Sequence, residues 1–276
     1  MPREEMESDS LLPSFVQPPL DEVAADLQFN PLAIKAADVG AFHALIAGEY
    51  PHSMDVPPLP PTFETEGGSS MSPFGQNIAA GFLPRSWFIS LNDEHLIQLQ
   101  TDRLIVNWRS RPNGNAYPLY QEVRKRFAAA HEALTVFVNQ RGYSDVVPNQ
   151  CDLSYFNKVP LPPGVEWGDV DQLLRGVTIN SFLTETEQFS DCHLLLRRSI
   201  RNQEGNTFRR LQVECRPIQT GVDQKAWGLN ITVKGRPAHP TLEAVLDFFD
   251  TAHVEIVRCF SAITTETMQS LWGKRT

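Results

Sequence analysis

Two long segments of the chain repeat apolar residues at three- and four-residue steps. They run from Pro118 to Val138 and from Pro240 to Phe260, and this spacing is typical of one face of an α-helix. Proline at the first position suits a helix start, because its missing N–H would have no partner there. The sequence therefore predicts one long helix in each half of the chain.

Shorter segments alternate apolar and polar residues, as half-buried strands do. In the segment Leu20 to Phe29, apolar Val23, Ala25 and Leu27 alternate with neighbours that are mostly polar. Asp152 to Val159 predicts a second such strand. A three-strand meander precedes each long helix, and its strands are predicted over 87–91, 96–100 and 104–109, and over 192–200, 207–218 and 227–233.

The two halves match each other position by position over the long helices. The matching pairs lie 122 positions apart without a gap, as in Phe127 with Phe249 and His131 with His253. Upstream, Val106-Asn107-Trp108 matches Leu229-Asn230-Ile231 with one residue of slippage. Each half has the order strand, helix, three-strand meander, helix. We interpret this pattern as a tandem duplication.

This element order predicts an α+β protein with antiparallel sheets and long helices packed on one face, in a saddle or helix-grip-like arrangement. Residues 1–17 are expected to form a flexible leader, residues 18–145 the first repeat and residues 146–276 the second. Residues 52–84 are rich in Pro, Gly and Ser, and we expect a flexible loop there. Whether the two repeats share one sheet is left open by the sequence.

Capping and turn residues predict several smaller elements. Asp38 is expected to cap a helix over Val39 to Glu49, and Asp169 a short helix that ends at Arg175. Glu204-Gly205-Asn206 predicts a hairpin turn, and Thr264-Thr265-Glu266 the start of a short terminal helical turn.

The composition indicates in which cellular compartment the protein works and which class of partner is disfavoured. The formal net charge of −9 gives no overall attraction to a phosphate backbone. The four cysteines lie far apart in the sequence, so no zinc or redox motif is formed locally, and we expect reduced, buried thiols. The acidic N-terminus is unlike a signal peptide, and no apolar run has the length of a membrane span. These features predict a cytoplasmic protein.

Residues that could carry chemistry fit structural roles better. His131 and His253 occupy matching helical positions, which favours a shared structural role over catalysis. Glu243, Asp247 and Asp250 follow one helical face and are expected to form a solvated acidic stripe. The chain has no zinc-protease motif, nucleophile elbow or phosphate loop. We predict no catalytic residue, no metal ligand and no cofactor, and an enzyme site assembled only by the fold stays open.

The alternation also predicts which sheet face is free. Leu104, Val106 and Trp108 should contact the helices, and the opposite face should be rich in Gln, Asn and Arg. Such a face is either a solvated outer surface or a recognition surface. The candidate binding residues on the predicted strands are Gln98, Gln100, Asn107, Arg109, His193, Arg197, Gln212, Arg216, Asn230 and Lys234.

Arginines that flank one predicted hairpin form a local basic cluster. The cluster consists of Arg197, Arg198, Arg201, Arg209 and Arg210. It would suit nucleic acid, but only Phe208 lies nearby as an aromatic platform for bases. A nucleic-acid accessory factor is therefore an alternative hypothesis.

Several short motifs resemble a sporadically distributed family of uncharacterised bacterial and archaeal proteins. They are Pro18-Pro19-Leu20 with Glu22-Val23 and Gln28-Phe29, then Asp102-Arg103, Asn107-Trp108-Arg109, Tyr117-Pro118, Leu153-Ser154-Tyr155 with Asn157, Ala252-His253, Phe260, Ile263-Thr264-Thr265 and Trp272. The resemblance covers residues 17 to 272. It implies a prokaryotic source and a shared fold, with no activity attached. The patchy distribution of such families resembles that of defence or toxin–antitoxin cassettes.

Together these features predict a binding protein without catalysis of its own. We expect it to use the polar sheet face to hold a partner protein or to self-associate, within a prokaryotic defence or toxin–antitoxin system.

Overall fold

The computed structural model describes residues 12–65, 68–71, 83–112, 114–178, 189–201, 207–220 and 224–275. The predicted turn at 204–206, residues 1–11 of the predicted leader and parts of the predicted loop 52–84 lie outside the described residues.

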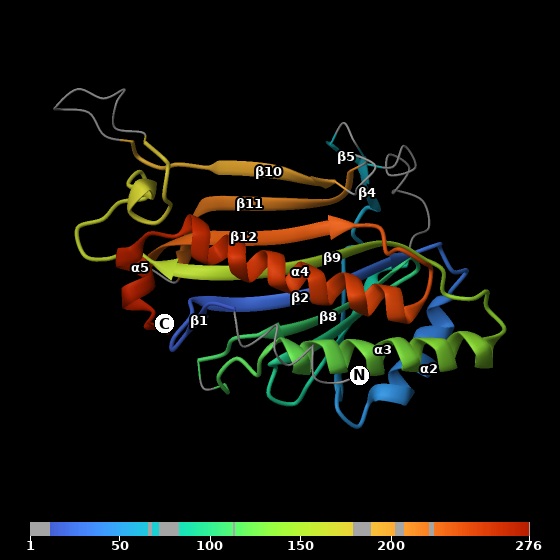
Figure 1. Ribbon diagram of the computed structural model, residues 1–276. Helices are drawn as coiled ribbons and strands as arrows, with labels where there is room; N and C mark the ends of the chain where they lie inside the picture. The colour runs from blue at the N-terminus through green and yellow to red at the C-terminus, as the bar shows by residue number, and fades with distance from the viewer. Residues whose placement is uncertain are drawn as a thin grey trace.

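A nine-stranded antiparallel sheet forms the centre of the molecule (Figure 1). Its strand order is β10-β11-β12-β9-β2-β8-β7-β6-β3. The strands are β2 (Leu20–Phe29), β3 (His52–Val56), β6 (Arg85–Ile89), β7 (His95–Gln100), β8 (Arg103–Arg109), β9 (Pro148–Pro160), β10 (Leu194–Arg201), β11 (Thr207–Thr220) and β12 (Gln224–Gly235). The predicted α+β class and both meanders are confirmed.

The two halves of the chain share this one sheet. Strands β2 and β9 pair at its centre, and each is followed outward by the last, the middle and the first strand of its own meander. The strand order is therefore the same on both sides of the central pair, apart from β3 at one edge. This symmetry is what a tandem duplication would produce, and the duplication itself stays a prediction.

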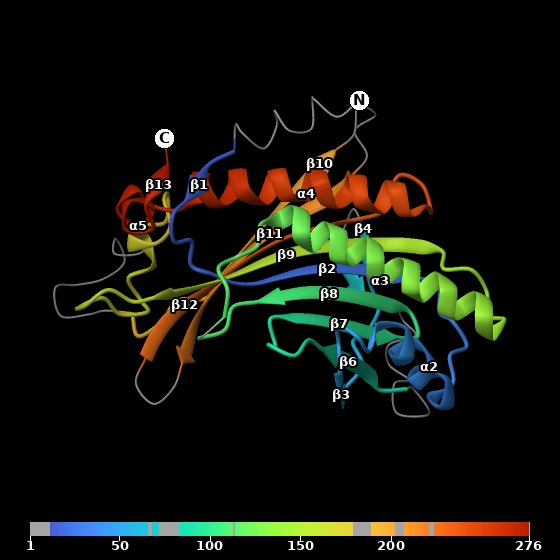
Figure 2. The same cartoon turned by 90° about the horizontal axis from the view of Figure 1, so that it is seen from below.

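Helices α3 (Tyr120–Arg141) and α4 (Leu242–Ile263) cross the same face of the sheet (Figures 1 and 2). Each begins two residues later than predicted, because Leu119 has a positive φ and Thr241 acts as an N-cap that accepts a hydrogen bond from the Ala244 N–H. Both ends of α4 still lie 122 positions after those of α3. No described helix is long and apolar enough to cross a membrane.

The core lies between these helices and the sheet. The predicted inward residues Leu104, Val106 and Trp108 are buried there, as are Leu229, Ile231 and Val233 from β12. Where α3 and α4 approach each other, the rings of Phe127 and Phe249 meet edge to face at 4.9 Å between centroids. The matching positions 127 and 249 thus also form a contact between the two helices.

Helix α2 (Ala36–Ile46) begins earlier than predicted and lies beside α3. Asp38 lies inside its first turn, and Lys35 is the N-cap residue. The predicted helix after Asp169 is only a short 3-10 turn, η2 (Val170–Gln172). The predicted terminal turn is confirmed as α5 (Glu266–Leu271), which Thr265 caps through the Met268 N–H.

Parts of two segments predicted to be flexible contain regular structure. Residues 12–17 contain β1 (Ser14–Phe15), which pairs with β13 (Lys274–Arg275), and Phe15 packs on Phe260 and Trp272. The predicted loop 52–84 contains β3 as well as the hairpin β4 (Thr62–Thr65) and β5 (Gly68–Met71). For β1 and β3 the prediction of flexibility was wrong, because each pairs with a strand that is distant in the sequence, whereas β4 and β5 pair with each other.

We expect Phe249→Ala to lower the free energy of unfolding by about 3–5 kcal/mol, because it leaves a cavity under both helices. Phe127→Ala should cost a similar amount. The double variant should reveal a coupling of about 0.5–1.5 kcal/mol from the lost ring contact. Urea unfolding measures each value.

The exposed Lys125 on α3 provides the control, and Lys125→Ala should change stability by less than about 0.5 kcal/mol. A Phe249→Ala loss no larger than that of Lys125→Ala would contradict the central role of this contact.

Candidate functional site

The sheet face opposite α3 and α4 is polar, as the alternation predicts, but its first half is buried. Gln98, Gln100 and Asn107 are 5 %, 7 % and 2 % exposed. The solvated-surface interpretation is therefore wrong for this half. Burial of amide side chains is costly unless they form hydrogen bonds, so their partners define what this face does.

One chain of hydrogen bonds links neighbouring strands across this face. Gln98 donates from Nε2 to Asn107 Oδ1 at 2.7 Å, and Asn107 donates from Nδ2 to Glu22 Oε1 at 2.6 Å. Burial raises the pKa of Glu22, and the Asn107 bond opposes that rise. Arg109 forms an ion pair with Asp93 and lies 5.6 Å from the centre of the Trp87 ring.

A proline-rich segment, Pro57–Pro61, lies across the same face. Gln100 accepts a hydrogen bond from the Leu59 N–H at 2.9 Å and donates to the Leu59 carbonyl at 2.8 Å. The Thr62 N–H donates to Gln28 Oε1, and Arg103 donates to the Pro60 carbonyl. These side chains bind the main chain of an extended segment, as the edge of a strand would. The sequence signal for this segment was its run of prolines, which holds a chain extended.

Two carboxylates face each other beneath this segment. Asp26 and Asp152 are directly opposed on β2 and β9. Arg103 pairs with Asp26 at 3.0 Å, and Lys234 pairs with Asp152 at 3.1 Å. Burial, with a further contribution from Asp152, raises the pKa of Asp26 to about 6, against the opposing effect of Arg103. At neutral pH the pair with Arg103 is therefore charged, and it is lost at mildly acidic pH.

Polar atoms without hydrogen-bond partners gather around this network. Among the described residues they include Nε of Arg85, Nε of Arg103, Nε1 of Trp87 and Oε1 of Gln98, all buried and all on strands of this face. Such atoms are uncommon in a folded protein.

The second half of the face is more open. His193 pairs with Glu214 at 3.0 Å, and Arg197 donates to Gln212 at 3.1 Å. Both His193 and Arg197 are exposed, and so is Arg216. Asn230, Gln212 and Lys234 are half-buried. The ten candidate residues therefore divide into two groups: Gln98, Gln100 and Asn107 are buried and Arg109 is half-buried on β7 and β8, whereas the others, on β10 to β12 or directly before β10, are more accessible.

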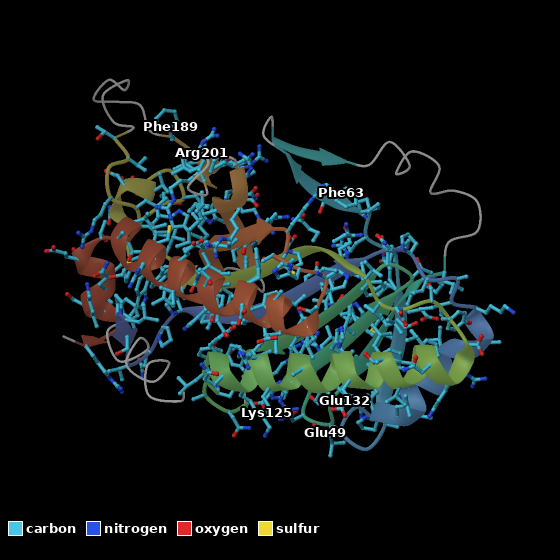
Figure 3. The ribbon with its side chains drawn as sticks, turned by 45° about the vertical axis from the view of Figure 1, so that its right-hand side comes forward. Glu49, Phe63, Lys125, Glu132, Phe189 and Arg201 are labelled. Atoms are coloured by element: carbon cyan, nitrogen blue, oxygen red, sulfur yellow. The ribbon has the colours of Figure 1, made fainter. Side chains whose placement is uncertain are left out.

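The predicted basic cluster is only partly accessible. Arg210 is 7 % exposed, and Arg209 lies 3.6 Å from Glu255 in an ion pair. Arg197, Arg198 and Arg201 are exposed on β10 (Figure 3 labels Arg201). Three of the five arginines thus remain at the surface.

Among the helical residues considered for chemistry, Asp250 has partners on the other long helix. Burial lowers the pKa of His131, which lines a small cavity. Asp250 accepts hydrogen bonds from Tyr120 and Arg124, so it belongs to a contact between α3 and α4 and not to a purely solvated stripe. Within the described residues, His, Cys, Asp and Glu form no cluster of three that could hold a metal ion. All four cysteines have free thiols.

No model of a known protein family matches this chain, and a search of curated proteins found no match either.

The raised pKa of Asp26 generates a pH prediction. The folded state holds a proton that the unfolded state loses between about pH 4 and 6, so this group destabilises the fold as pH rises through that range. Between about pH 4 and 6 the titration of Asp26 should lower the free energy of unfolding by up to about 3 kcal/mol. Urea unfolding from pH 4 to 7 measures the slope.

Asp26→Asn should remove this contribution to the slope, whereas Asp145→Asn, at an exposed position, should retain it. Equal slopes for the wild type and Asp26→Asn would refute the assignment.

Proposed function

We propose that this protein binds an extended segment of a partner protein along the second half of its polar sheet face. One observation carries the proposal: Gln100 holds both the N–H and the carbonyl of Leu59 in the protein's own proline-rich segment. The face therefore already holds an extended main chain through its amide side chains. The same residue types continue on β11 and β12 as Gln212 and Asn230, which are half-buried.

Strand β10 adds a place for main-chain pairing. It is the edge strand on this side, and among the described strands none pairs with its outer edge. Leu195 and Leu196 on β10 are 45 % and 53 % exposed. Long edge strands with exposed apolar residues tend to pair with another chain, and natural proteins usually protect them. A partner strand that adds here would cover both leucines.

Charge favours an acidic partner segment. Arg197 on β10 and Arg216 on β11 are exposed on the polar face, Arg201 is exposed at the end of β10, and Arg198 is exposed on the helix side of the same edge strand. A second copy that paired antiparallel with β10 would bring the same arginines together, which is unfavourable. An extended segment with Asp or Glu would instead form charge-assisted contacts with them. This supports a partner of different sequence over self-association.

The wider setting of the proposal comes from the sequence. We propose a cytoplasmic partner within a prokaryotic defence or toxin–antitoxin system, because the patchy distribution of the family that the motifs resemble is like that of such cassettes. A nucleic-acid partner has less support, because Arg209 and Arg210 of the basic cluster are engaged or buried.

The test uses the full chain purified gently from its own cells and analysed by native mass spectrometry. We expect a second polypeptide at fixed stoichiometry. Combined alanine substitution of Arg197, Gln212, Arg216 and Asn230 should weaken its binding at least tenfold, because several hydrogen bonds and charges are lost together.

The control is Lys125→Ala with Glu132→Ala on α3, away from this face (Figure 3), and this variant should retain the partner. Retention by the sheet variant, or equal loss by the control, would refute the proposal. Binding that is lost on nuclease treatment would favour the nucleic-acid hypothesis instead.

A further inference from the structure

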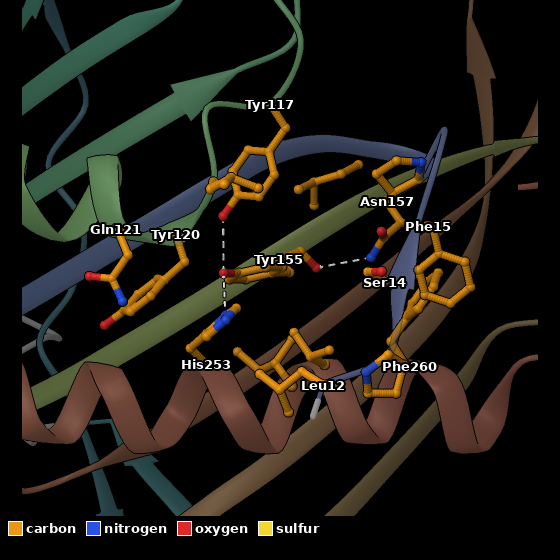
Figure 4. Close-up of a pocket in the computed structure, with 16 residues that line it drawn as sticks. Leu12, Ser14, Phe15, Tyr117, Tyr120, Gln121, Tyr155, Asn157, His253 and Phe260 are labelled. Carbon is orange, nitrogen blue, oxygen red and sulfur yellow. Dashed lines mark hydrogen bonds between the residues drawn. The ribbon is translucent and has the colours of Figure 1, made fainter. Parts of the chain in front are cut away.

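A second site lies on the other side of the sheet, where α3 begins. A cavity of about 310 Å³ opens between the start of α3, the middle of α4, strand β9 and residues 12–18 (Figure 4). None of the ten candidate residues lines it. Residues of the motifs Pro18-Pro19-Leu20, Tyr117-Pro118, Leu153-Ser154-Tyr155 and Ala252-His253 meet there, although they are far apart in the sequence.

One end of the cavity is polar. The hydroxyls of Tyr117 and Tyr155 share a hydrogen bond of 3.1 Å, and the Tyr155 hydroxyl lies 2.8 Å from Nδ1 of His253. Figure 4 shows the three side chains in one line, with the Tyr155 hydroxyl in the middle. They come from the segment before α3, from β9 and from α4, so the fold assembles them.

The orientation of His253 is fixed by a neighbouring ring. Tyr120 stacks on the imidazole at 4.3 Å between ring centres, with the planes 6° apart. The Tyr120 hydroxyl donates to Asp250 at 2.7 Å, and Arg124 holds the same carboxylate at 2.9 Å. Burial raises the pKa of Tyr120, so its hydroxyl stays protonated and keeps donating. A site with this much support is preorganised for a ligand.

The rest of the cavity is apolar. Leu12, Phe15, Leu20, Ile256, Val257 and Phe260 form its wall. No Lys, Arg, Asp or Glu is among the described residues that line it. A charged ligand would therefore lose its hydration without gaining an opposite charge, whereas a neutral polar head could bond to the tyrosine hydroxyls.

The matching place in the other half shows that the fold does not require this polar end. There a cavity of about 220 Å³ has four lining residues that match lining residues of the larger cavity at a spacing of 122 positions. The matching pairs are His131 with His253, Thr135 with Val257, Val138 with Phe260, and Leu242 with Tyr120. Leu242 replaces the stacked tyrosine, and no tyrosine lines this cavity among the described residues. The same helix arrangement thus forms without the tyrosines, so their gathering around His253 calls for another reason.

Backbone strain marks the same site. Leu119 lines the larger cavity and has a φ of 74°, in a region that side chains other than glycine rarely adopt. Its side chain is 68 % exposed, so burial of this leucine does not account for the strain. Strained residues cluster at binding sites, where the surrounding structure holds them in place.

We propose that this cavity binds a small, uncharged, largely apolar molecule with one hydroxyl or carbonyl head. The head bonds to the pair of Tyr117 and Tyr155, and the apolar part packs against Ile256, Val257 and Phe260. The volume suits roughly ten to fifteen non-hydrogen atoms at protein packing density.

The probe is n-octanol, with octanoate as its charged counterpart, and isothermal titration calorimetry on the full chain is the measurement. We expect saturable binding of one n-octanol per chain and weaker binding of octanoate. Tyr117→Phe with Tyr155→Phe should lower the affinity about tenfold, because the rings remain and only the hydroxyls are lost. Val257→Phe should abolish binding by filling the cavity.

Thr135→Val is the matched control in the smaller cavity and should leave the affinity unchanged. Near-UV circular dichroism and the Tm of each variant establish that it is folded, and Val257→Phe still tests the site if the tyrosine variant unfolds. No saturable n-octanol binding, tighter binding of octanoate, an unchanged affinity in the tyrosine variant or equal loss in Thr135→Val would each overturn the proposal.

Discussion

The antiparallel pairing of β2 with β9 is the constraint on which the rest of the structure depends. It joins the two halves of the chain into one sheet and fixes which residues face the helices. Val23 is opposite Tyr155, and Ala25 is opposite Leu153, so this register buries apolar pairs on the helix side. A slip of one residue would exchange the core face with the polar face, because side chains alternate along a strand.

The same register has an electrostatic cost on the other face. It places Asp26 opposite Asp152, and like charges directly across a ladder repel each other. Arg103 and Lys234 offset this repulsion, each from a neighbouring strand. At the centre of the polar face the basic residues therefore stabilise the fold by pairing with these carboxylates. Toward β10 and β11 the basic residues are more accessible.

Much of the architecture could be predicted from periodicity, because alternating strands and three- to four-residue helical spacing are local patterns. The inward positions of β8 and β12 and the two long helices follow directly from them. Helices α3 and α4 each begin two residues after the predicted proline. A proline-first pattern does not reveal the positive φ of Leu119 or the N-cap at Thr241.

The burial of the candidate site was not predictable in this way. The polar alternation of β7 and β8 was visible, but the segment that covers Gln100 lies 41 positions away and its composition is that of a loop. The cluster of Tyr117, Tyr155 and His253 was hidden for the same reason. Its members belong to different elements, and each position alone has an ordinary structural explanation.

The pairing of β1 with β13 ties the two ends of the described chain into one unit. The Val16 and Gln17 N–H groups donate to the carbonyls of Gly273 and Trp272, and Phe15 packs on Phe260 and Trp272. Residues 12–18 form one wall of the larger cavity, so the C-terminal residues hold that wall in place from outside. A substitution that disrupts the pairing of β13 with β1, or a proteolytic cut that removes β13, therefore perturbs the cavity.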